Sequence, residues 1–416
     1  MSVPSVVRAS GARFTHGGAG LGEALDGFLA ARPRPPRLLG LGEPTHGVEV
    51  FCELRNMVLR HLVRVWGFRS VVVESDCLAG LVVDDHVASG TGDVEEVMAA
   101  GFSHGFGDLA TNRELVQWLR GYNAGRGADE RVRFHGFDGP VEITGASSPR
   151  AALGGLHGYL SEHLGAVPHA WERIDALAGA DGEWTEPGAM SDPRRSVGAS
   201  ERARELRVVA DDLAGVLSAE APGLVAATSR EAFERARLFA RTARGLLRYH
   251  AVMARVEEDD ATRMARLVAA RDAMMADNLR AVARVERDRG PSLVFAHNQH
   301  LRRGAGAMTM AGRELGWWCA GAIAAVDLGR EYAVIAADAG TFPGLGAAGA
   351  DTFQGVLGRA AGEGALWPAD RLAAALEGEQ VARRADADHT YFPLGPGDLG
   401  GVDGVLFVGD AAPGRG

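Results

Sequence analysis

Two short apolar runs joined by a stretch of helical periodicity constrain the fold of this chain more than any other feature. Residues 38–42 and 70–73 are apolar without polar alternation, which is typical of strands that are covered on both faces. Between them, the apolar residues from Val48 to Trp66 recur at helical spacing, and Gly67 stands where a C-terminal cap is expected. This order of strand, helix and strand predicts a βαβ unit and a parallel sheet.

The same alternation continues along the chain. A helix is expected around residues 112–125 and a strand at residues 131–139. Strand signals resume at the segments 291–300, 317–326, 331–340 and 403–410. We therefore expect an α/β fold with a mostly parallel central sheet, which is flanked by helices and receives strands from both halves of the chain.

The middle of the chain has a different character. Between about residue 148 and residue 289 the sequence is long, charged and helically periodic, without strand signals. This predicts an all-helical insertion. The expected division is therefore residues 1–147 for the first half of the α/β domain, 148–265 for the insertion and 266–416 for the second half. Within the insertion, the Gly-, Pro- and Ser-rich segment 179–200 is expected to be a mobile loop.

Composition narrows the classes of function. The net charge of -10 argues against a nucleic-acid-binding surface, and the absence of an apolar run of about 18 residues argues against a membrane span. The 3 cysteines are odd in number and far apart, so no disulfide framework is expected. Because the first residues also lack the apolar stretch of a secretory signal, we expect a cytoplasmic protein that acts on a small molecule.

Titratable residues gather where the predicted strands end. Ligands of open parallel sheets bind beyond the carboxyl ends of the strands. The acids and imidazoles at or near these ends are Glu43, His46, Glu74, Asp76, His135, Asp138, His297 and His300. Any one of them alone is adequately explained as a helix cap or a solvated side chain, but their recurrence over four strands favours a functional site.

Arg55 supports the same site by a different route. Helical spacing places Arg55 within the apolar stripe of its helix. A buried guanidinium requires a partner, and Glu43 and Glu74 are the expected ones. The alternative is that Arg55 extends from the edge of the stripe to water.

Common catalytic signatures are absent from the sequence. It contains no G-x-S-x-G elbow, Walker A loop, H-E-x-x-H motif or paired C-x-x-C. The spacing of His297 and His300 allows a metal ligand pair but is not a specific zinc signature. We therefore expect no cofactor; a metal remains possible but is not favoured.

Seven motifs in order resemble one known family. They are "GEPTHG", "FCELR", "GFRSVVVESD", "RELVQWLRGYN", "FHGFDG", "RDAMMADNL" and "AHNQH", and together they resemble the erythromycin esterase family from about Leu38 to His300. The resemblance implies an α/β domain with a helical insertion over its cleft. It also implies hydrolysis of a macrolactone ester without a serine nucleophile, with His46 as the base that activates water.

The resemblance also carries over individual residues. The catalytic set that it implies is His46, Glu43, Arg55, Glu74, His297 and His300. Arg271, Asp272 and Asn278 match the R-D-x-x-M-x-x-N helix of the family. We expect Arg271 and Asn278 to bind substrate, together with the strand-end residues Asp76 and Asp138, and place Asp272 with them as a second-tier candidate.

These residues support one main hypothesis and two alternatives. The main hypothesis is a hydrolase that opens a lactone or ester of a macrolide or related secondary metabolite, as in antibiotic resistance, through a water activated by a histidine base. The first alternative is a non-hydrolytic tailoring enzyme that uses the same acid–base site for cyclisation, elimination, dehydration or epimerisation. The second is a non-catalytic binder of the same ligands. The sequence does not indicate an oligomeric state.

Overall fold

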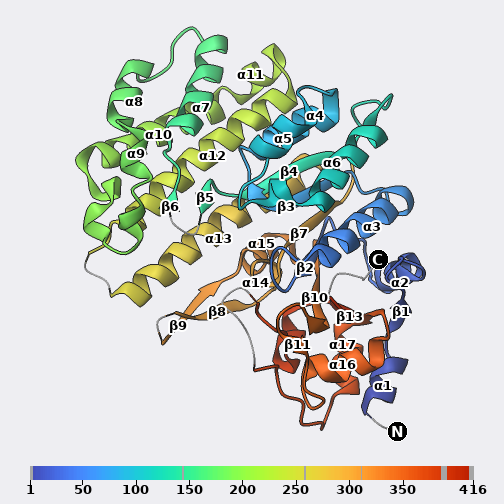
Figure 1. The fold of residues 1–416 in the computed structure, drawn as a ribbon. Helices are drawn as coiled ribbons and strands as arrows, with labels where there is room; N and C mark the ends of the chain where they lie inside the picture. Colours follow the sequence, from blue (N-terminus) through green and yellow to red (C-terminus); the bar gives the residue numbers. More distant parts are fainter. Residues whose placement is uncertain (1–2, 143–144, 257–258, 311, 386–390, 412–416) are drawn as a thin grey trace.

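A mostly parallel central sheet organises the molecule (Figure 1). The computed structural model describes residues 3–142, 145–256, 259–310, 312–385 and 391–411. The strand order is β1 (Ala12–Phe14), β12 (Gly364–Pro368), β13 (Gly404–Asp410), β10 (Tyr332–Phe342), β2 (Leu38–Glu43), β7 (Ser292–His297), β3 (Ser70–Asp76) and β4 (Arg133–Asp138). The strands from β13 to β4 are parallel, whereas β12 and β1 add an antiparallel edge, and β11 (Gly346–Ala347) pairs with the end of β10. The predicted fold class is confirmed.

Helices cover both faces of the sheet. One face packs against α2 (Leu21–Ala30), α3 (Glu49–Val65), α4 (Gly80–Ser89), α5 (Val94–Ala100) and α6 (Ala110–Asn123). The other packs against α1 (Val3–Ala9), α13 (Asp260–Val285), α15 (Ala320–Leu328), α16 (Phe353–Ala361) and α17 (Ala369–Ala375). Successive residues of β2 show the principle, since Leu38 belongs to the second core and Leu39 to the first. Strands buried on both faces explain why the apolar runs of the sequence lack polar alternation.

The helical insertion follows β4 and has a core of its own (Figure 1). It contains α7 (Arg150–His163), α8 (Trp171–Ala178), α10 (Glu201–Ala219), α11 (Ala221–Ala227) and α12 (Arg230–Met253). Its α12 packs along α13, and α13 also contacts β4 of the sheet. The expected boundary between residues 265 and 266 lies inside the continuous helix α13, and the division into three segments stays a prediction.

Two local expectations were wrong. The segment 179–200 is not a loop, because it forms α9 (Asp181–Trp184) and the 3-10 turns η2 (Pro187–Met190), η3 (Pro193–Arg195) and η4 (Val197–Ala199). The side chains of Glu186, Asp192 and Ser196 cap these turns, and Trp184 anchors the segment in the core of the insertion.

The segment 317–326 is not a strand of the central sheet. It contains the end of β9 (Arg313–Trp318), which pairs with β8 (Ala305–Met310) in a separate hairpin, and then most of α15. The Ala-rich sequence of α15 packs against α13, and an apolar run of this length fits a buried helix as well as a strand. The remaining short elements are η1 (Phe106–Asp108), β5 (Val141–Glu142), β6 (Gly145–Ala146), α14 (Asn298–Leu301), η5 (Gly329–Glu331) and η6 (Pro396–Gly401). No helix in the described part of the chain is long and apolar enough to cross a membrane.

Candidate active site

The carboxyl ends of β2, β7, β3 and β4 bring most of the expected site residues together. These strands are neighbours in the sheet. Their register places Glu43 beside His297 and Asp76 beside Asp138. The rule that ligands bind at this edge therefore points to one cluster.

Glu43 and His46 form the pair that the first motif predicts. Glu43 ends β2 and is buried, and its Oε1 accepts a hydrogen bond from Nδ1 of His46 at 2.7 Å. Gly47 adopts a φ of +77° between His46 and the start of α3, a conformation that suits glycine. The His46 side chain keeps 36% of its surface exposed, so its ring is accessible to solvent.

Glu74 connects three cationic side chains. Its Oε1 lies 3.0 Å from Nη2 of Arg271, 3.3 Å from Nε2 of His300 and 3.7 Å from Nε2 of His46. Its Oε2 accepts the backbone N–H of His297 at 2.8 Å. Burial alone would raise the pKa of Glu74, but these cationic neighbours hold it far below its usual range. Glu74 is therefore a fixed negative charge at the centre of the cluster.

His300 is held from its other side by Asp272. Nδ1 of His300 lies 2.5 Å from Oδ1 of Asp272, and the indole N–H of Trp317 donates to Oδ2 of the same carboxylate. Burial would lower the pKa of His300, but the charges of Asp272 and Glu74 raise it above its ordinary value. The imidazolium of His300 is thus stabilised between two carboxylates.

Arg271 connects Glu74 to Asp138. Its Nε lies 3.0 Å from Oδ2 of Asp138 and its Nη2 lies 2.6 Å from the same atom. Asp138 is fully buried and also contacts Nε2 of His104 at 3.1 Å. Because 23% of the Arg271 side chain remains exposed, the side chain is accessible to a ligand that binds at the strand ends.

The surroundings of His46 favour its charged form. Burial would lower the pKa of His46, but the charge of Glu74 and the hydrogen bond and charge of Glu43 raise it to about 9. The pKa of Glu43 is also raised, because the cost of burying its charge exceeds the effect of His46. The two groups therefore titrate as a coupled pair.

Arg55 is buried as expected, but its partners are neutral. Its guanidinium donates to Oδ1 of Asn112 at 2.7 Å, to Oδ1 of Asn56 at 2.9 Å and 3.1 Å, and to the carbonyl of Thr111 at 3.4 Å. It also lies 5.0 Å from the centre of the Phe295 ring. Within the described residues it forms no ion pair with the two expected glutamates, since amide and carbonyl oxygens satisfy its donors instead.

His297 has both ring nitrogens engaged by the backbone. Its Nε2 donates to the carbonyl of Pro44 at 2.9 Å and its Nδ1 accepts the N–H of Gln299 at 3.1 Å. Burial and the neighbouring charge of His46 lower its pKa to about 3. His297 is therefore neutral and joins the β2 and β7 loops, and it has no free N–H for an oxyanion.

Three other expected residues have protein partners away from the catalytic pair. Oδ1 of Asn278 accepts from Nε of Arg241 at 2.6 Å and its Nδ2 donates to the carbonyl of Phe137 at 3.0 Å, so Asn278 ties α13 to α12 and β4. Oδ1 of Asp76 accepts the N–H of Leu78 at 2.7 Å and shapes the turn before α4, and burial raises the pKa of Asp76 to about 6. His135 pairs with Glu286 at 3.1 Å. Substrate contact by Asp76 and Asn278 stays a prediction without support from these bonds.

Sequence reasoning missed His104, Phe106 and Trp317. His104 and Phe106 lie in the segment between α5 and α6, and Trp317 lies in the β8–β9 hairpin. None of the three follows a strand of the central sheet, so the strand-end rule has no means of finding them. The only local signal in the sequence is that Gly105 directly follows His104 and Gly107 directly follows Phe106.

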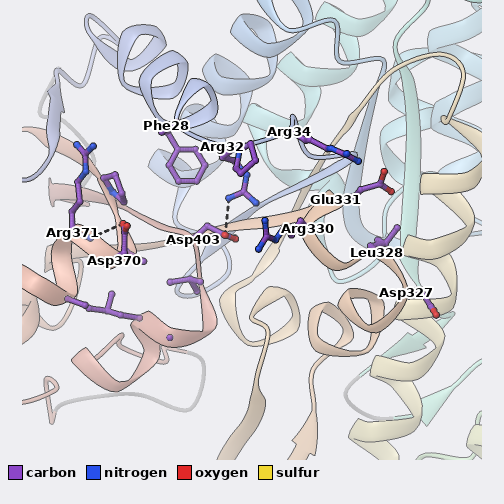
Figure 2. A pocket seen from close by; sticks show the side chains of 18 residues that line it. Phe28, Arg32, Arg34, Asp327, Leu328, Arg330, Glu331, Asp370, Arg371 and Asp403 are labelled. Atoms are coloured by element: carbon purple, nitrogen blue, oxygen red, sulfur yellow. Dashed lines mark hydrogen bonds and ion pairs between the residues drawn. The ribbon is translucent and has the colours of Figure 1, made fainter.

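A larger cavity lies at the opposite ends of the strands. Its volume is about 1410 Å³, and its lining includes Arg34, Glu331 and Asp403, which precede β2, β10 and β13. Figure 2 shows Arg32 bonded to Asp403 at its centre. No residue of the strand-end cluster lines this cavity. Cavity volume alone would therefore point away from the candidate site.

A metal centre would require several acid or imidazole side chains to converge on one point. Among the residues that the structure describes, no three His, Cys, Asp or Glu side chains are grouped as they would be to hold a metal ion. The expectation that the protein works without a cofactor stays a prediction.

Comparisons with known proteins agree with this picture of the fold. The sequence model of the family described as erythromycin esterase matches residues 63–355. No curated protein matches the chain.

Three solved structures share the fold. A Bacillus cereus protein is 17% identical with a TM-score of 0.73, covering 99% of this chain and 98% of that one. A succinoglycan biosynthesis protein is 14% identical with a TM-score of 0.71, covering 98% and 96%. A histidine-to-asparagine variant of the erythromycin esterase EreC, in its open conformation, is 18% identical with a TM-score of 0.65, covering 93% of each chain.

Proposed function

Because the chain belongs to the erythromycin esterase family, we propose that it is a hydrolase that opens a lactone or ester of a macrolide or related secondary metabolite. The observation that supports this most directly is the distance of 2.7 Å between Nδ1 of His46 and Oε1 of Glu43, together with the solvent-accessible ring of His46. A carboxylate behind an accessible imidazole is the arrangement that general-base activation of water requires. Opening a macrolide ring in this way would be a route to antibiotic resistance.

In the proposed reaction, His46 acts through its two nitrogens. Nδ1–H donates to Glu43, which leaves Nε2 as the base that takes a proton from water. The resulting hydroxide attacks the ester carbonyl carbon and forms a tetrahedral oxyanion. When the bond from carbon to the leaving oxygen breaks, the proton on Nε2 passes to the alkoxide, so that one water yields one acid and one alcohol. Glu43 and Glu74 stabilise the imidazolium between these steps.

Arg271 is the group best placed to stabilise the oxyanion. It is a permanent cation, it is held by Glu74 and Asp138, and its side chain is partly exposed. The donors of Arg55 and His297 are directed to protein atoms instead. His300 is nearly buried, with 9% of its side chain exposed, so it stabilises Glu74 and the local charge balance.

The test is turnover of a macrolide panel in ¹⁸O-labelled water, followed by mass spectrometry. We expect a product that is heavier by one water and carries one labelled oxygen in its acid group, and we expect His46→Gln to lose at least about a hundredfold in kcat. A product of unchanged mass without label would instead identify a cyclising or isomerising enzyme. Full turnover by a folded His46→Gln variant would show that His46 is not the base, and binding without any turnover would identify a binder.

A further inference from the structure

His104 lies between two carboxylates from different parts of the chain. Its Nε2 contacts Oδ2 of Asp138 at the end of β4 at 3.1 Å, and its Nδ1 contacts Oε2 of Glu142 in β5 at 2.7 Å. The backbone N–H of His104 also donates to Oε1 of Glu142 at 3.1 Å. One side chain thus joins the segment after α5 to the turn that follows β4.

The backbone at His104 is in the left-handed region. Its φ is 59°, and among the described non-glycine residues only His169 shares this property, with a φ of 63°. A β-carbon makes this conformation unfavourable, so it persists only where surrounding contacts enforce it. The contacts of His104 with Asp138 and Glu142 hold this backbone, together with the hydrogen bonds of the preceding Ser103 to Ser75 and Asp76.

The segment that His104 fixes carries Phe106 to the catalytic pair. The ring centre of Phe106 lies 5.6 Å from that of His104 and 5.3 Å from that of His46. Phe106 also lines a small buried cavity beside Glu43 and Glu74. Its ring therefore forms the apolar wall on one side of the proposed base.

We propose that His104 is a positioning residue that clamps the segment 103–108 to Asp138 and Glu142, and thereby holds the Phe106 ring against His46. The expected change in kcat/KM rests on the proposed function, whereas the expected change in the titration of His46 does not. His104 contacts neither His46 nor its two glutamates. It acts on His46 through Phe106, and through Asp138 it also adjoins Arg271.

The surroundings of His104 favour its charged form. Four charged groups face it: Asp138 from β4, Glu142 from β5, Arg271 from α13 and Asp76 from the end of β3. Burial and the charge of Arg271 lower the pKa of His104. The hydrogen bond and charge of Asp138, together with the charge of Glu142, outweigh them and raise this pKa above its ordinary value. The imidazolium can then bind both carboxylates at once.

Loss of the clamp has a specific consequence for His46. Phe106 lies against His46 and lines the small cavity beside Glu43 and Glu74, so its ring limits the access of water to these groups, and charges interact more strongly where water is excluded. If the ring moves away, water relieves the burial that lowers the pKa of His46 but also weakens the attraction of the glutamates that raises it. Because the attraction outweighs burial in the folded protein, the pKa of His46 should fall from about 9 toward the 6.5 of a free imidazole.

The variant that tests this is His104→Asn, because asparagine tolerates a left-handed backbone but cannot reach both carboxylates. Its matched control is His169→Asn in the helical insertion, where Nε2 of a second left-handed histidine contacts Asp212 at 2.8 Å. Both variants remove histidine–carboxylate contacts at the same kind of backbone position, two for His104 and one for His169. Only His104→Asn removes the link to Phe106.

The first readout is an NMR titration of the histidine rings, with the His46 signal assigned by its absence in His46→Gln. We expect the titration midpoint of His46 to fall by about one pH unit in His104→Asn and to stay unchanged in His169→Asn. The second readout is the acid limb of kcat/KM for the macrolide turned over, which should move to lower pH by the same amount. Lack of any turnover would count against the proposed function and leave the titration result standing.

Glu142→Gln provides a second and milder variant, since 52% of the Glu142 side chain is exposed and its replacement should leave the fold intact. We expect a smaller shift of His46 in this variant and no further shift when it is combined with His104→Asn, because both act on one clamp. Equal losses of thermal stability in the two histidine variants, with the His46 titration unchanged in both, would overturn the proposal and reduce His104 to a structural role.

Discussion

At the scale of single residues, the ionisation of His46 links the geometry of the site to its activity. A general base acts in its deprotonated form, so kcat/KM should rise with pH until His46 has lost its proton. Because the pKa of His46 is raised to about 9 by its two glutamates, the rising limb should extend well above neutral pH.

Glu43→Gln tests this cause directly. The amide oxygen of glutamine keeps an acceptor for Nδ1 of His46 but removes the charge, so the pKa of His46 should fall and the rising limb of kcat/KM should move to lower pH by about one unit. The measurement is the pH dependence of kcat/KM, with the exposed Glu114→Gln as control. An unchanged limb would mean that Glu43 does not set the ionisation of His46.

The residues that could be predicted from the sequence share one physical property. Glu43, His46, Glu74 and Asp138 follow strands, and parallel strands bring their carboxyl ends to the same edge. Partners are set by finer geometry, which spacing does not contain. Arg55 was correctly expected to be buried, but nothing in the sequence indicates that Asn112 and Asn56 would satisfy it.

At the scale of elements, β10 holds the segment 391–394 in place. Asp338, near its carboxyl end, accepts four hydrogen bonds, from Gln354, Tyr391, Leu394 and its own neighbour Ala339. Burial nevertheless raises its pKa to about 6. The ordered segment places the Phe392 ring 5.3 Å from that of His297, so this strand supports the rear of the site.

Asp338→Asn should destabilise the protein, because the new amide N–H₂ would face donors where an acceptor is needed. We expect the free energy of unfolding near neutral pH to fall by about 1–3 kcal/mol, measured by urea denaturation. The matched control is Asp370→Asn on the exposed surface of α17, which should have little effect. Equal stability of the two variants would show that the four hydrogen bonds contribute nothing net.

Elements were predicted best where the pattern has one physical meaning. The buried strands β2, β3, β4, β7, β10 and β13 all lie within or beside the segments expected from their apolar runs. The antiparallel edge strands β1 and β12 are short and were not expected. In α15 the apolar residues surround the helix, so periodicity does not separate a helix from a strand.

At the scale of the whole molecule, the buried site should make folding sensitive to acid. The folded pKa of His297 is about 3 against 6.5 for the free side chain. Its contribution is therefore fully present above about pH 6.5 and is lost as the pH falls toward 3, because only the unfolded chain takes up the proton. Glu74, whose pKa is lowered, acts in the same direction below the pKa of 4.5 of a free glutamate side chain.

His297→Gln should remove the first of these effects, because glutamine supplies one donor and one acceptor without a titration. From about pH 7 to about pH 5, the wild-type free energy of unfolding should fall by roughly 2 kcal/mol more than that of the variant. Urea denaturation at both pH values measures this difference, with the exposed His16→Gln as control. Parallel pH dependence in wild type and His297→Gln would contradict a neutral His297.

The point at which the helical insertion joins the sheet determines which parts of the protein can be exchanged. The insertion leaves the sheet after β4 and returns through α13, and α13 carries Arg271 and Asp272 of the catalytic cluster. A chimaera that took its insertion from another family member would therefore need its second crossover between α12 and α13. With that crossover, the insertion is inherited apart from Arg271 and Asp272, whereas a crossover within α13 divides the helix that carries them.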